Sequence, residues 1–455
     1  LSYTTTARRM PYGFRAMVSG TSIDEIRRAL EGAETKEGYL STAAASPTSA
    51  FCFTGQGSQY LGMGRQLFDI PQFRSIITGL DDILRLQGFQ SIIPILNRTC
   101  DTPMEDLPPA VLQLSITCLQ MALGKFWKLL GIVPVAVVGH SLGEYAALNT
   151  AGVLSDADTI HIVGTRAVLL EKKCAMGTHA MLAIKAPLAQ VGSLIESSPG
   201  LEVACINGPS ETVVAGTTGD ISSLSDTLSK LGVKGTLLKV QFAFHSAQVD
   251  EMLDSYRQAC RSVTFKDPAI PILSSSKGKV MTKSSDFGSP AEYLASHCRQ
   301  PVKFSEAILE GSQEGIVSEK TIWIELGPHP ICSNMVKNIL GPKVRALPSL
   351  RRGEDDWKVL VATLTSLYEC GLSINWSEYH SGFKNSVSVI GLPAYQWELK
   401  EFWIQYRHDW CLTKGDPPSA SLALPPAIEE PEKIFTASVH HIIEEKSSPS
   451  ASSIT

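Results

Sequence analysis

The stretch that decides the fold reads VPVAVVGHSLGEYAAL and occupies residues 133–148. Its first part, 133–138, is an apolar run that predicts a buried strand, and its last part, 144–148, predicts a helix. Between them Gly139, Ser141 and Gly143 follow the spacing G-x-S-x-G, which is typical of a nucleophilic serine on a sharp strand-to-helix turn. The glycines let the two backbones approach. The serine then lies at a helix N-terminus, where free N–H groups favour negative charge.

The composition limits the classes of protein that fit. The chain has 455 residues, of which 44% are hydrophobic and 19% charged, enough for one large or two to three modest domains. The net charge of −5 and the scattered basic residues argue against nucleic-acid binding. No apolar run approaches the roughly 18 residues of a membrane helix. The ten cysteines are dispersed and lack metal-site spacing, so we expect reduced thiols, a cytoplasmic location and no metal.

The order of elements predicts an α/β fold. Strands and helices alternate from the apolar segment at residue 50 to about residue 345, which favours a hydrolase-like core built on a parallel sheet. Residues 179–244 follow a different order, βαββαβ, which is the ferredoxin-like arrangement. We expect this unit to be inserted in the larger body and to create a cleft with it. Its predicted strands are 180–184, 202–206, 212–215 and 236–240, and its predicted helices are 188–195 and 221–231.

The two ends of the chain differ from this core. Residues 1–48 contain an amphipathic stretch at 22–30 but too little apolar content for a core of their own, so we expect them to pack on a neighbour. Towards the other end, a helix is predicted at 357–368, followed by an aromatic run that ends at Trp397. After residue 410 the chain becomes rich in Pro and Ser, which is typical of a flexible linker, and residues 435–445 could begin another element.

Four further features could carry chemistry. The loop GQGSQ, residues 55–59, can present backbone N–H groups to an anion or an oxyanion, although a tight turn alone explains it, and it lacks the Gly-Lys-Ser/Thr of an ATP site. Arg166 lies in an apolar helix pattern and needs an anionic partner, either a structural ion pair or a substrate carboxylate. His245, in the run FAFH, is either a core residue or a general base, and His297 is a weaker candidate for the base.

These motifs together resemble malonyl-CoA:acyl-carrier-protein transacylases, and most closely the acyltransferase domain of fungal non-reducing iterative type I polyketide synthases. The resemblance covers essentially the whole chain. It implies that Ser141 is the nucleophile that carries a malonyl ester and that His245 is the base. It further implies an oxyanion hole formed by the backbone amides of Gln56 and Leu142, and Arg166 as the group that binds the free carboxylate of malonate.

The resemblance also suggests roles for other residues of the cleft. Asn207 is expected to face the cleft, and the ring of Phe244 is expected to fill the space of an α-methyl group and so favour malonyl over methylmalonyl. Where bacterial relatives carry a glutamine that supports the base, the nearest match here is His297, which leaves open what orients His245. No acid of a Ser-His-Asp triad is evident, which fits a dyad held by backbone or amide groups.

The resemblance implies substrates, partners and boundaries as well. The substrates would be malonyl-CoA and the phosphopantetheine thiol of an acyl carrier protein, with no bound cofactor. The ketosynthase and product-template domains of the same chain would be further partners. Residues 1–48 would end the ketosynthase–acyltransferase linker and 49–345 would form the acyltransferase domain. Residues 346–410 would form the following linker, and 411–455 a flexible linker with the truncated start of a product-template domain.

Three alternatives use the same residues differently. An α/β-hydrolase or thioesterase would share Ser141, but its residue order is Ser…acid…His and its acyl pocket is apolar, so a buried Arg166 would be of no use. A non-catalytic docking module of a synthase would not need the serine, histidine and arginine. A starter-unit transacylase would stand at the front of a synthase, whereas the linker-like segments on both sides favour an internal, extender-loading position.

Overall fold

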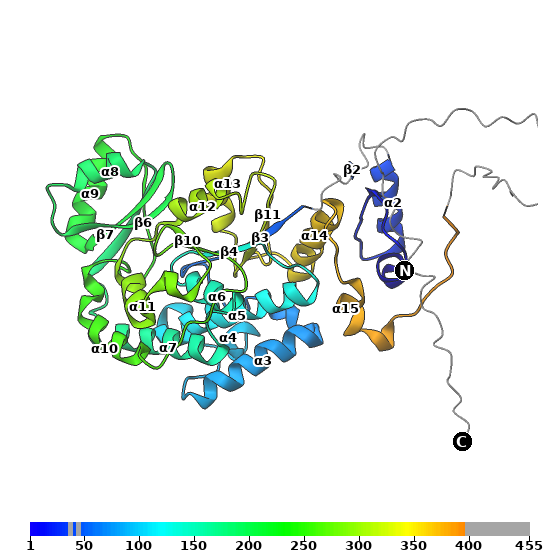
Figure 1. The fold of residues 1–455 in the computed structure, drawn as a ribbon, viewed down its shortest axis with the longest axis horizontal. Coiled ribbons are helices and arrows are strands. Elements are labelled where there is room, and N and C mark those ends of the chain that lie inside the picture. The colour runs from blue at the N-terminus through cyan, green and yellow to red at the C-terminus, as the bar shows by residue number, and fades with distance from the viewer. Residues whose placement is uncertain (35–39, 42–46, 396–455) are drawn as a thin grey trace, which may run out of the picture. The chain divides into compact units, whose positions relative to one another are not determined.

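The computed structural model describes residues 1–34, 40–41 and 47–395. Its core is a six-stranded sheet with the order β10-β9-β4-β3-β11-β12 (Figure 1). β10 runs antiparallel to β9, and the other neighbouring strands pair in parallel. The predicted α/β fold with a parallel-sheet core is therefore confirmed. The strands are β3 (Ser49–Phe53), β4 (Ala136–Gly139), β9 (Ile272–Ser274), β10 (Lys279–Met281), β11 (Ile322–Leu326) and β12 (Ala346–Pro348).

Helices cover both faces of this sheet. α12 and α13 pack on one face, and α5 and α6 pack on the other (Figure 1). Every residue of β3, β4 and β11 is consequently buried, which explains why these strands are mainly apolar and do not alternate with exposed polar residues. The helices of the body are α3 (Pro71–Leu86), α4 (Ile93–Leu96), α5 (Pro109–Leu129), α6 (Gly143–Thr150), α7 (Asp156–Lys173), α10 (Asp250–Cys260), α11 (Pro290–Arg299), α12 (Phe304–Gln313) and α13 (Cys332–Leu340).

The strand before the serine is shorter than the apolar run predicts. β4 begins at Ala136 rather than at residue 133. Val133 is 65% exposed, and Pro134 has no N–H to donate to a neighbouring strand. The N–H of Val135 donates to the carbonyl of Ser49 at 2.7 Å, so the chain joins the sheet only from that residue onward.

Residues 179–237 form the predicted ferredoxin-like subdomain. Its antiparallel sheet has the order β6-β7-β5-β8, which a βαββαβ unit produces when each helix crosses over one strand. α8 and α9 share an apolar cluster with one face of this sheet, on the side away from the main body (Figure 1). The elements are β5 (His179–Ile184), α8 (Leu188–Ile195), β6 (Leu201–Gly208), β7 (Glu211–Thr217), α9 (Thr218–Lys230) and β8 (Gly235–Leu237).

The last strand of the subdomain ends earlier than predicted. The sequence predicts a strand over 236–240, but β8 ends at Leu237. The N–H of Leu238 still donates to the carbonyl of Met181 at 2.9 Å, and then the N–H of Val240 turns back to the carbonyl of Leu238 at 3.1 Å. The chain therefore leaves the sheet and crosses to the main body just before His245.

A second connection joins the subdomain to the body through β6. The register of β6 against β7 shifts twice, near Ala204 and Asn207. There the N–H of Val302 donates to the carbonyl of Ala204 at 2.9 Å, and the N–H of Ile206 donates to the carbonyl of Val302 at 2.8 Å. The irregular part of β6 thus pairs with the chain that follows α11.

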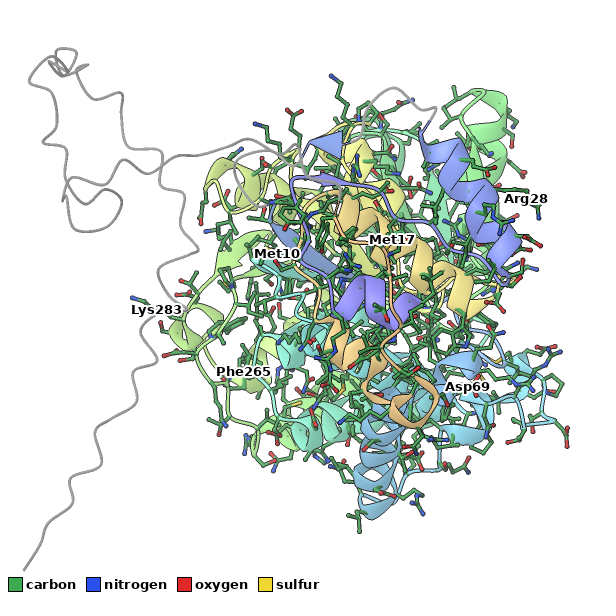
Figure 2. All side chains as sticks on the ribbon, turned by 90° about the vertical axis from the view of Figure 1, so that its right-hand side faces the viewer. Met10, Met17, Arg28, Asp69, Phe265 and Lys283 are labelled. Carbon is green, nitrogen blue, oxygen red and sulfur yellow. The ribbon has the colours of Figure 1, made fainter. Side chains whose placement is uncertain are left out.

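The N-terminal segment packs on the segment that follows the sheet. α1 contacts α15, and the Thr6 hydroxyl lies 2.9 Å from Nε2 of His380. Arg28 on α2 points into solvent (Figure 2). The elements are α1 (Ser2–Ala7), β1 (Phe14–Arg15), α2 (Ile23–Glu34), β2 (Leu40–Ser41), α14 (Asp356–Glu369) and α15 (Trp376–Ser381), and the short 3-10 helices of the chain are η1 (Arg65–Asp69), η2 (Met104–Asp106), η3 (Ala247–Val249), η4 (Ser284–Phe287) and η5 (Lys384–Ser386).

Several predictions concern residues that the structure does not describe. The aromatic run beyond Tyr395 and the element at 435–445 lie outside the described residues. The boundaries at residues 48, 345 and 410 stay predictions. Within the described part of the chain, no helix is long and apolar enough to cross a membrane.

Candidate active site

Ser141 lies on the predicted sharp turn between β4 and α6. Its φ of 50° is left-handed, a conformation that costs a non-glycine residue free energy. A Cβ on Gly139 would lie 2.2 Å from the backbone N of Glu144, and a Cβ on Gly143 would lie 2.2 Å from the backbone O of Phe53. Only glycine fits at either position, which is the reason that the G-x-S-x-G spacing suggested.

Ser141 and His245 form a hydrogen-bonded pair. Ser141 Oγ lies 2.7 Å from His245 Nε2, although 104 residues separate them in the chain. On the other side of the imidazole, Nδ1 lies 2.9 Å from the backbone O of Gln300. A carbonyl only accepts, so Nδ1 carries the proton and Nε2 is left free to accept the proton of Ser141. This is the geometry of a nucleophile with its general base.

The environment of His245 keeps its imidazole neutral. The residue is 1% exposed, and this burial is the main reason that its pKa lies well below 6.5. The nearby His297, Arg166 and His140 lower the pKa further, in that order. A neutral imidazole at physiological pH is the form that a general base requires.

Gln300, which orients the imidazole of His245, could not be predicted from the sequence. Gln300 acts through its backbone carbonyl, so its side chain gives no signal in the sequence. His297, the position matched to the supporting glutamine of relatives, has a different contact: its Nε2 donates to the backbone O of Ser141 at 3.0 Å. Burial lowers the pKa of His297 to about 3, so this ring is neutral too.

The glycine-rich loop lies against the turn that carries the serine. A Cβ on Gly55 would be 3.0 Å from the backbone O of His140 and 3.6 Å from Cβ of Ser141. Gln56 and Gly57 of this loop line the same cavity as Ser141. Leu142 is fully buried where α6 begins. The amides of Gln56 and Leu142 are thus carried by two segments that meet at Ser141, and their role as an oxyanion hole stays a prediction.

Arg352, which follows the last strand of the main sheet in the sequence, holds the glycine-rich loop. Its Nη2 donates to the backbone O of Ser58 at 2.9 Å and to that of Gln59 at 3.0 Å. The guanidinium also lies over the ring of Tyr60, 5.3 Å from the centroid. The residues around Arg352 in the sequence give no indication that its side chain reaches this loop.

A cavity of about 280 Å³ opens beside the dyad. Its floor comes from the elbow and the glycine-rich loop of the main body. The rest of its wall comes from the ferredoxin-like sheet, from the chain between β8 and η3 and from the start of α13, which confirms the expected cleft between the two units. Its apolar and sulfur-bearing lining residues are Met181, Ala183, Cys205, Val213, Leu238, Val240, Phe244, Ile331, Cys332 and Met335.

Asn207 faces this cavity, as predicted, and is held by two polar neighbours. Its Oδ1 lies 2.8 Å from His140 Nε2, and its Nδ2 donates to Glu211 at 3.4 Å. Burial lowers the pKa of His140, so its neutral ring donates from Nε2 to the amide oxygen. The contact joins the subdomain to the residue that precedes the nucleophile.

Arg166 is buried next to the cavity rather than on its wall. It is 1% exposed on α7, and its Nη1 donates to Oε1 of Gln113 at 2.8 Å. The guanidinium carbon lies 5.2 Å from the ring centroid of Phe244, which does line the cavity. Among the residues that the structure describes, no carboxylate forms an ion pair with Arg166, and its Nε has no hydrogen-bond partner. A buried cation in this state suits an anionic ligand.

Two cysteines of the cavity wall are protonated. Burial raises the pKa of Cys205 to about 12 and that of Cys332 well above its ordinary value. All nine cysteines within the described ranges are free thiols. Those same ranges contain no group of three or more side chains suited to a metal ion.

Comparison with known sequences agrees with this site. Residues 50–373 match the family described as "Acyl transferase domain". The chain is 54% identical over 461 residues to the non-reducing polyketide synthase ustP of Ustilaginoidea virens, covering 100% of this chain and 22% of that protein. It is 46% identical over 426 residues to the conidial pigment polyketide synthase alb1 of Aspergillus fumigatus, covering 93% of this chain and 20% of that protein. The chain spans about a fifth of the length of these curated relatives.

Solved structures with the same fold are acyltransferases as well. The acyltransferase domain from the second module of the salinomycin polyketide synthase has a TM-score of 0.73 and 27% identity, covering 83% of this chain and 87% of that one. The malonyl CoA-acyl carrier protein transacylase of Clostridium perfringens has a TM-score of 0.62 and 25% identity, covering 71% of this chain and 98% of that one. With its dyad, its cleft and its match over residues 50–373, the chain belongs to the acyl transferase domain family and is an acyltransferase of the polyketide synthase type.

Proposed function

We propose that this acyltransferase moves malonyl groups from malonyl-CoA to an acyl carrier protein through an ester on Ser141. The observation that carries the proposal is the Ser141–His245 dyad beside Arg166, a buried cation without a carboxylate partner in the described chain. Malonyl-CoA has a group for each of them: a thioester carbonyl that the serine can attack and a free carboxylate that the guanidinium can bind.

In the first half-reaction, His245 Nε2 accepts the proton of Ser141 as Oγ attacks the thioester carbonyl. The carbonyl oxygen becomes an oxyanion, to which the amides of Gln56 and Leu142 donate. The C–S bond then breaks, and the imidazolium returns its proton to the sulfur of CoA. The carbonyl of Gln300 accepts from Nδ1 throughout, so the imidazolium keeps the orientation that serves both transfers.

The second half-reaction reverses this sequence with a different thiol. The phosphopantetheine thiol of the carrier protein gives its proton to His245 Nε2 and attacks the Ser141 ester. The C–O bond of the ester breaks, and Ser141 recovers the proton. No redox change occurs in either half, so no cofactor is needed beyond the two thiols.

The alternative functions have less support from the site. A hydrolase or thioesterase acting on neutral acyl groups would leave the guanidinium of Arg166 unpaired at a cost in free energy. A docking module would have no need for the left-handed backbone at Ser141 and His245, which costs free energy in each case. A starter-unit transacylase would share the dyad, so the choice of acyl group separates it from the extender-loading function proposed here.

We further propose that ketosynthase and product-template domains in the same polypeptide are the partners of this domain. The support is that the curated relatives, named as non-reducing polyketide synthases, are about five times as long as this chain. The free thiols within the described residues support a reducing, cytoplasmic location.

The test is mass spectrometry of the protein after incubation with malonyl-CoA and, separately, with acetyl-CoA. We expect one malonyl group on the peptide that contains Ser141 and little acetyl. Adding a carrier protein should remove the malonyl group and place it on the phosphopantetheine thiol. The matched control is Ser141→Ala, which removes only a hydroxyl and should fold but take up nothing. An adduct on Ser58 or on a cysteine, or equal loading of acetyl, would contradict the proposal.

A further inference from the structure

Glu202 bonds to the main body at two points that flank the catalytic histidine. The residue lies on β6 of the ferredoxin-like subdomain. Its Oε1 accepts from the backbone N–H of Ala247 at 2.9 Å, and its Oε2 accepts from Nη1 of Arg299 at 2.6 Å. Ala247 follows His245 by two residues, and Arg299 directly precedes Gln300. One carboxylate therefore contacts both chain segments that meet in the His245–Gln300 hydrogen bond.

Arg299 also bonds to the first turn of α10. Its Nε donates to Oδ1 of Asp250 at 2.6 Å, at the first turn of α10. α10 follows η3, so Asp250 belongs to the same stretch of chain as His245 and Ala247. The guanidinium therefore holds the start of α10 and the end of α11 at a fixed separation, and His245 and Gln300 lie on these two sides.

The backbone of His245 needs such support. Its φ of 59° is left-handed, and a side chain other than glycine keeps that conformation only where the surroundings determine it. Two hydrogen bonds act within the loop: Ser246 Oγ donates to the carbonyl of Ala243 at 2.6 Å, and the N–H of Ala243 donates to Oε1 of Gln248 at 2.6 Å. Glu202 supplies a restraint from outside the loop.

The same strand is fixed to the carbonyl side of the dyad. The N–H of Val302 donates to Ala204 and its carbonyl accepts from Ile206, both on β6. Glu202 is therefore two residues away from a backbone pairing with the segment that carries Gln300. β6 reaches the base through Ala247 and reaches the acceptor of the base through Arg299 and Val302.

We propose that Glu202 and Arg299 are positioning residues of this acyltransferase, which hold the carbonyl of Gln300 and the imidazole of His245 in hydrogen-bond geometry. The ferredoxin-like subdomain would thus support the base as well as forming part of the cavity wall. The side chains of Arg299 and Glu202 are 25% and 30% exposed. An ion pair that water reaches contributes little to stability, so its removal should affect the rate far more than the folding.

The test compares the Glu202–Arg299 ion pair with a control ion pair between α10 and α11, the two helices that Arg299 and Asp250 also join. Arg257 Nε donates to Glu292 at 3.1 Å and links α10 to α11 without contacting the loop of His245 or β6. We expect Glu202→Ala to slow acylation of Ser141 by malonyl-CoA by roughly 10- to 100-fold with little change in KM, because the base is misaligned. Glu292→Ala should change the rate by at most about twofold, as is usual for surface substitutions.

Two further variants separate positioning from a general structural effect. Glu202→Gln keeps an acceptor for the N–H of Ala247 but loses the ion pair, so it should recover part of the rate. Glu202→Ala combined with Arg299→Ala should be about as slow as the slower single variant, because both act on one hydrogen bond. Equal rates for Glu202→Ala and Glu292→Ala, or multiplied losses in the double variant, would overturn the inference.

The inference rests on the proposed function only for its acyl donor, and a second probe removes that dependence. A fluorophosphonate labels an activated serine whatever the natural substrate is. If wild type takes up no malonyl but its labelling depends on Glu202, the proposed function fails and the inference stands. If malonyl loads normally and neither reaction depends on Glu202, the inference fails and the proposed function stands.

Discussion

His297 donates a hydrogen bond from Nε2 to the backbone carbonyl of Ser141, across 3.0 Å. Because a carbonyl cannot donate, this contact needs a proton on Nε2 and leaves Nδ1 as the unprotonated nitrogen. Nδ1 is buried and has no hydrogen-bond partner. Ser141, whose φ is left-handed, is thus held at its backbone carbonyl by a buried ring whose second protonation carries a desolvation cost.

This arrangement predicts a loss of stability in acid. The pKa of His297 is about 3 in the folded protein, with burial as the main cause, and about 6.5 in the unfolded chain. Between these values the unfolded state binds the extra proton, so the free energy of unfolding should fall as pH falls from 6.5 towards 3. The slope for this one group is about 1.4 kcal/mol per pH unit.

The measurement is urea unfolding at several pH values, compared with His297→Gln. Glutamine has an amide that can donate to the same carbonyl and does not titrate. The difference in unfolding free energy between the two proteins should therefore depend on pH only below about 6.5. A difference that stays constant down to pH 4 would show that His297 does not supply the acid sensitivity.

Removal of the base should slow acylation without preventing it. His245→Ala deletes the imidazole that lies 2.7 Å from Ser141 Oγ, so we expect malonyl loading to slow by roughly 100- to 10,000-fold. Rapid quenching followed by intact-protein mass spectrometry gives this rate. A near-normal rate would assign the proton transfer to another group, and His297 would be the next residue to replace.

Replacement of Arg166 should change the choice of acyl group. Arg166→Ala removes the buried cation that we propose binds the malonyl carboxylate, so malonyl transfer should decrease and the relative use of acetyl-CoA should rise. Arg166→Lys keeps the charge but not the planar pair of donors, so its malonyl transfer should be intermediate between that of wild type and that of Arg166→Ala. Equal losses for both donors would point to a structural arginine that holds Gln113 and Phe244.

Phe244 should limit branching at the α-carbon. Its ring lines the cavity and packs on the guanidinium of Arg166, so Phe244→Ser should open space for an α-methyl group. One methyl in an apolar pocket shifts binding by about 1–3 kcal/mol, so the preference for malonyl over methylmalonyl should be no more than roughly 10- to 200-fold.

The readout for Phe244 is a competition between malonyl-CoA and methylmalonyl-CoA, expressed as the ratio of kcat/KM values. Phe244→Leu serves as the control, because it keeps an apolar side chain at the same place and should retain most of the preference. If wild type already uses both donors equally, the steric explanation is wrong.

The parts of the site that could be predicted are those in which a side chain is needed for its own chemistry or its size. Gly139 and Gly143 were identifiable because the turn leaves no room for a Cβ, and Ser141 and His245 because the hydrogen-bonded pair needs their own functional groups. Gln300 was not, because any residue offers the same carbonyl. Glu202 and Arg352 act over long sequence separations through backbone atoms of distant segments, which no local pattern reports.

The fold, too, could be predicted in part from the sequence. The βαββαβ order gave the strand order of the subdomain, because that connectivity allows few arrangements. The ends of two strands were wrong, at β4 and β8. Each strand end depends on where the chain begins or stops pairing with a neighbouring strand. Val133 is exposed to solvent before β4 begins, and after Leu237 the chain leaves the sheet and crosses to the main body.

The buried thiols of the cavity wall have a consequence for chemoselectivity. Cys205 and Cys332 line the same cavity as Ser141, and the proposed function places a thioester there, with which thiolates would exchange readily. With a pKa of about 12, Cys205 is ionised in only about one molecule in 100,000 at pH 7. Burial also raises the pKa of Cys332 well above the ordinary value of a thiol, so this side chain is protonated at pH 7 as well. Under the proposed function, the burial of these two sulfurs therefore disfavours transfer of the acyl group to a thiol and favours its transfer to Ser141 Oγ.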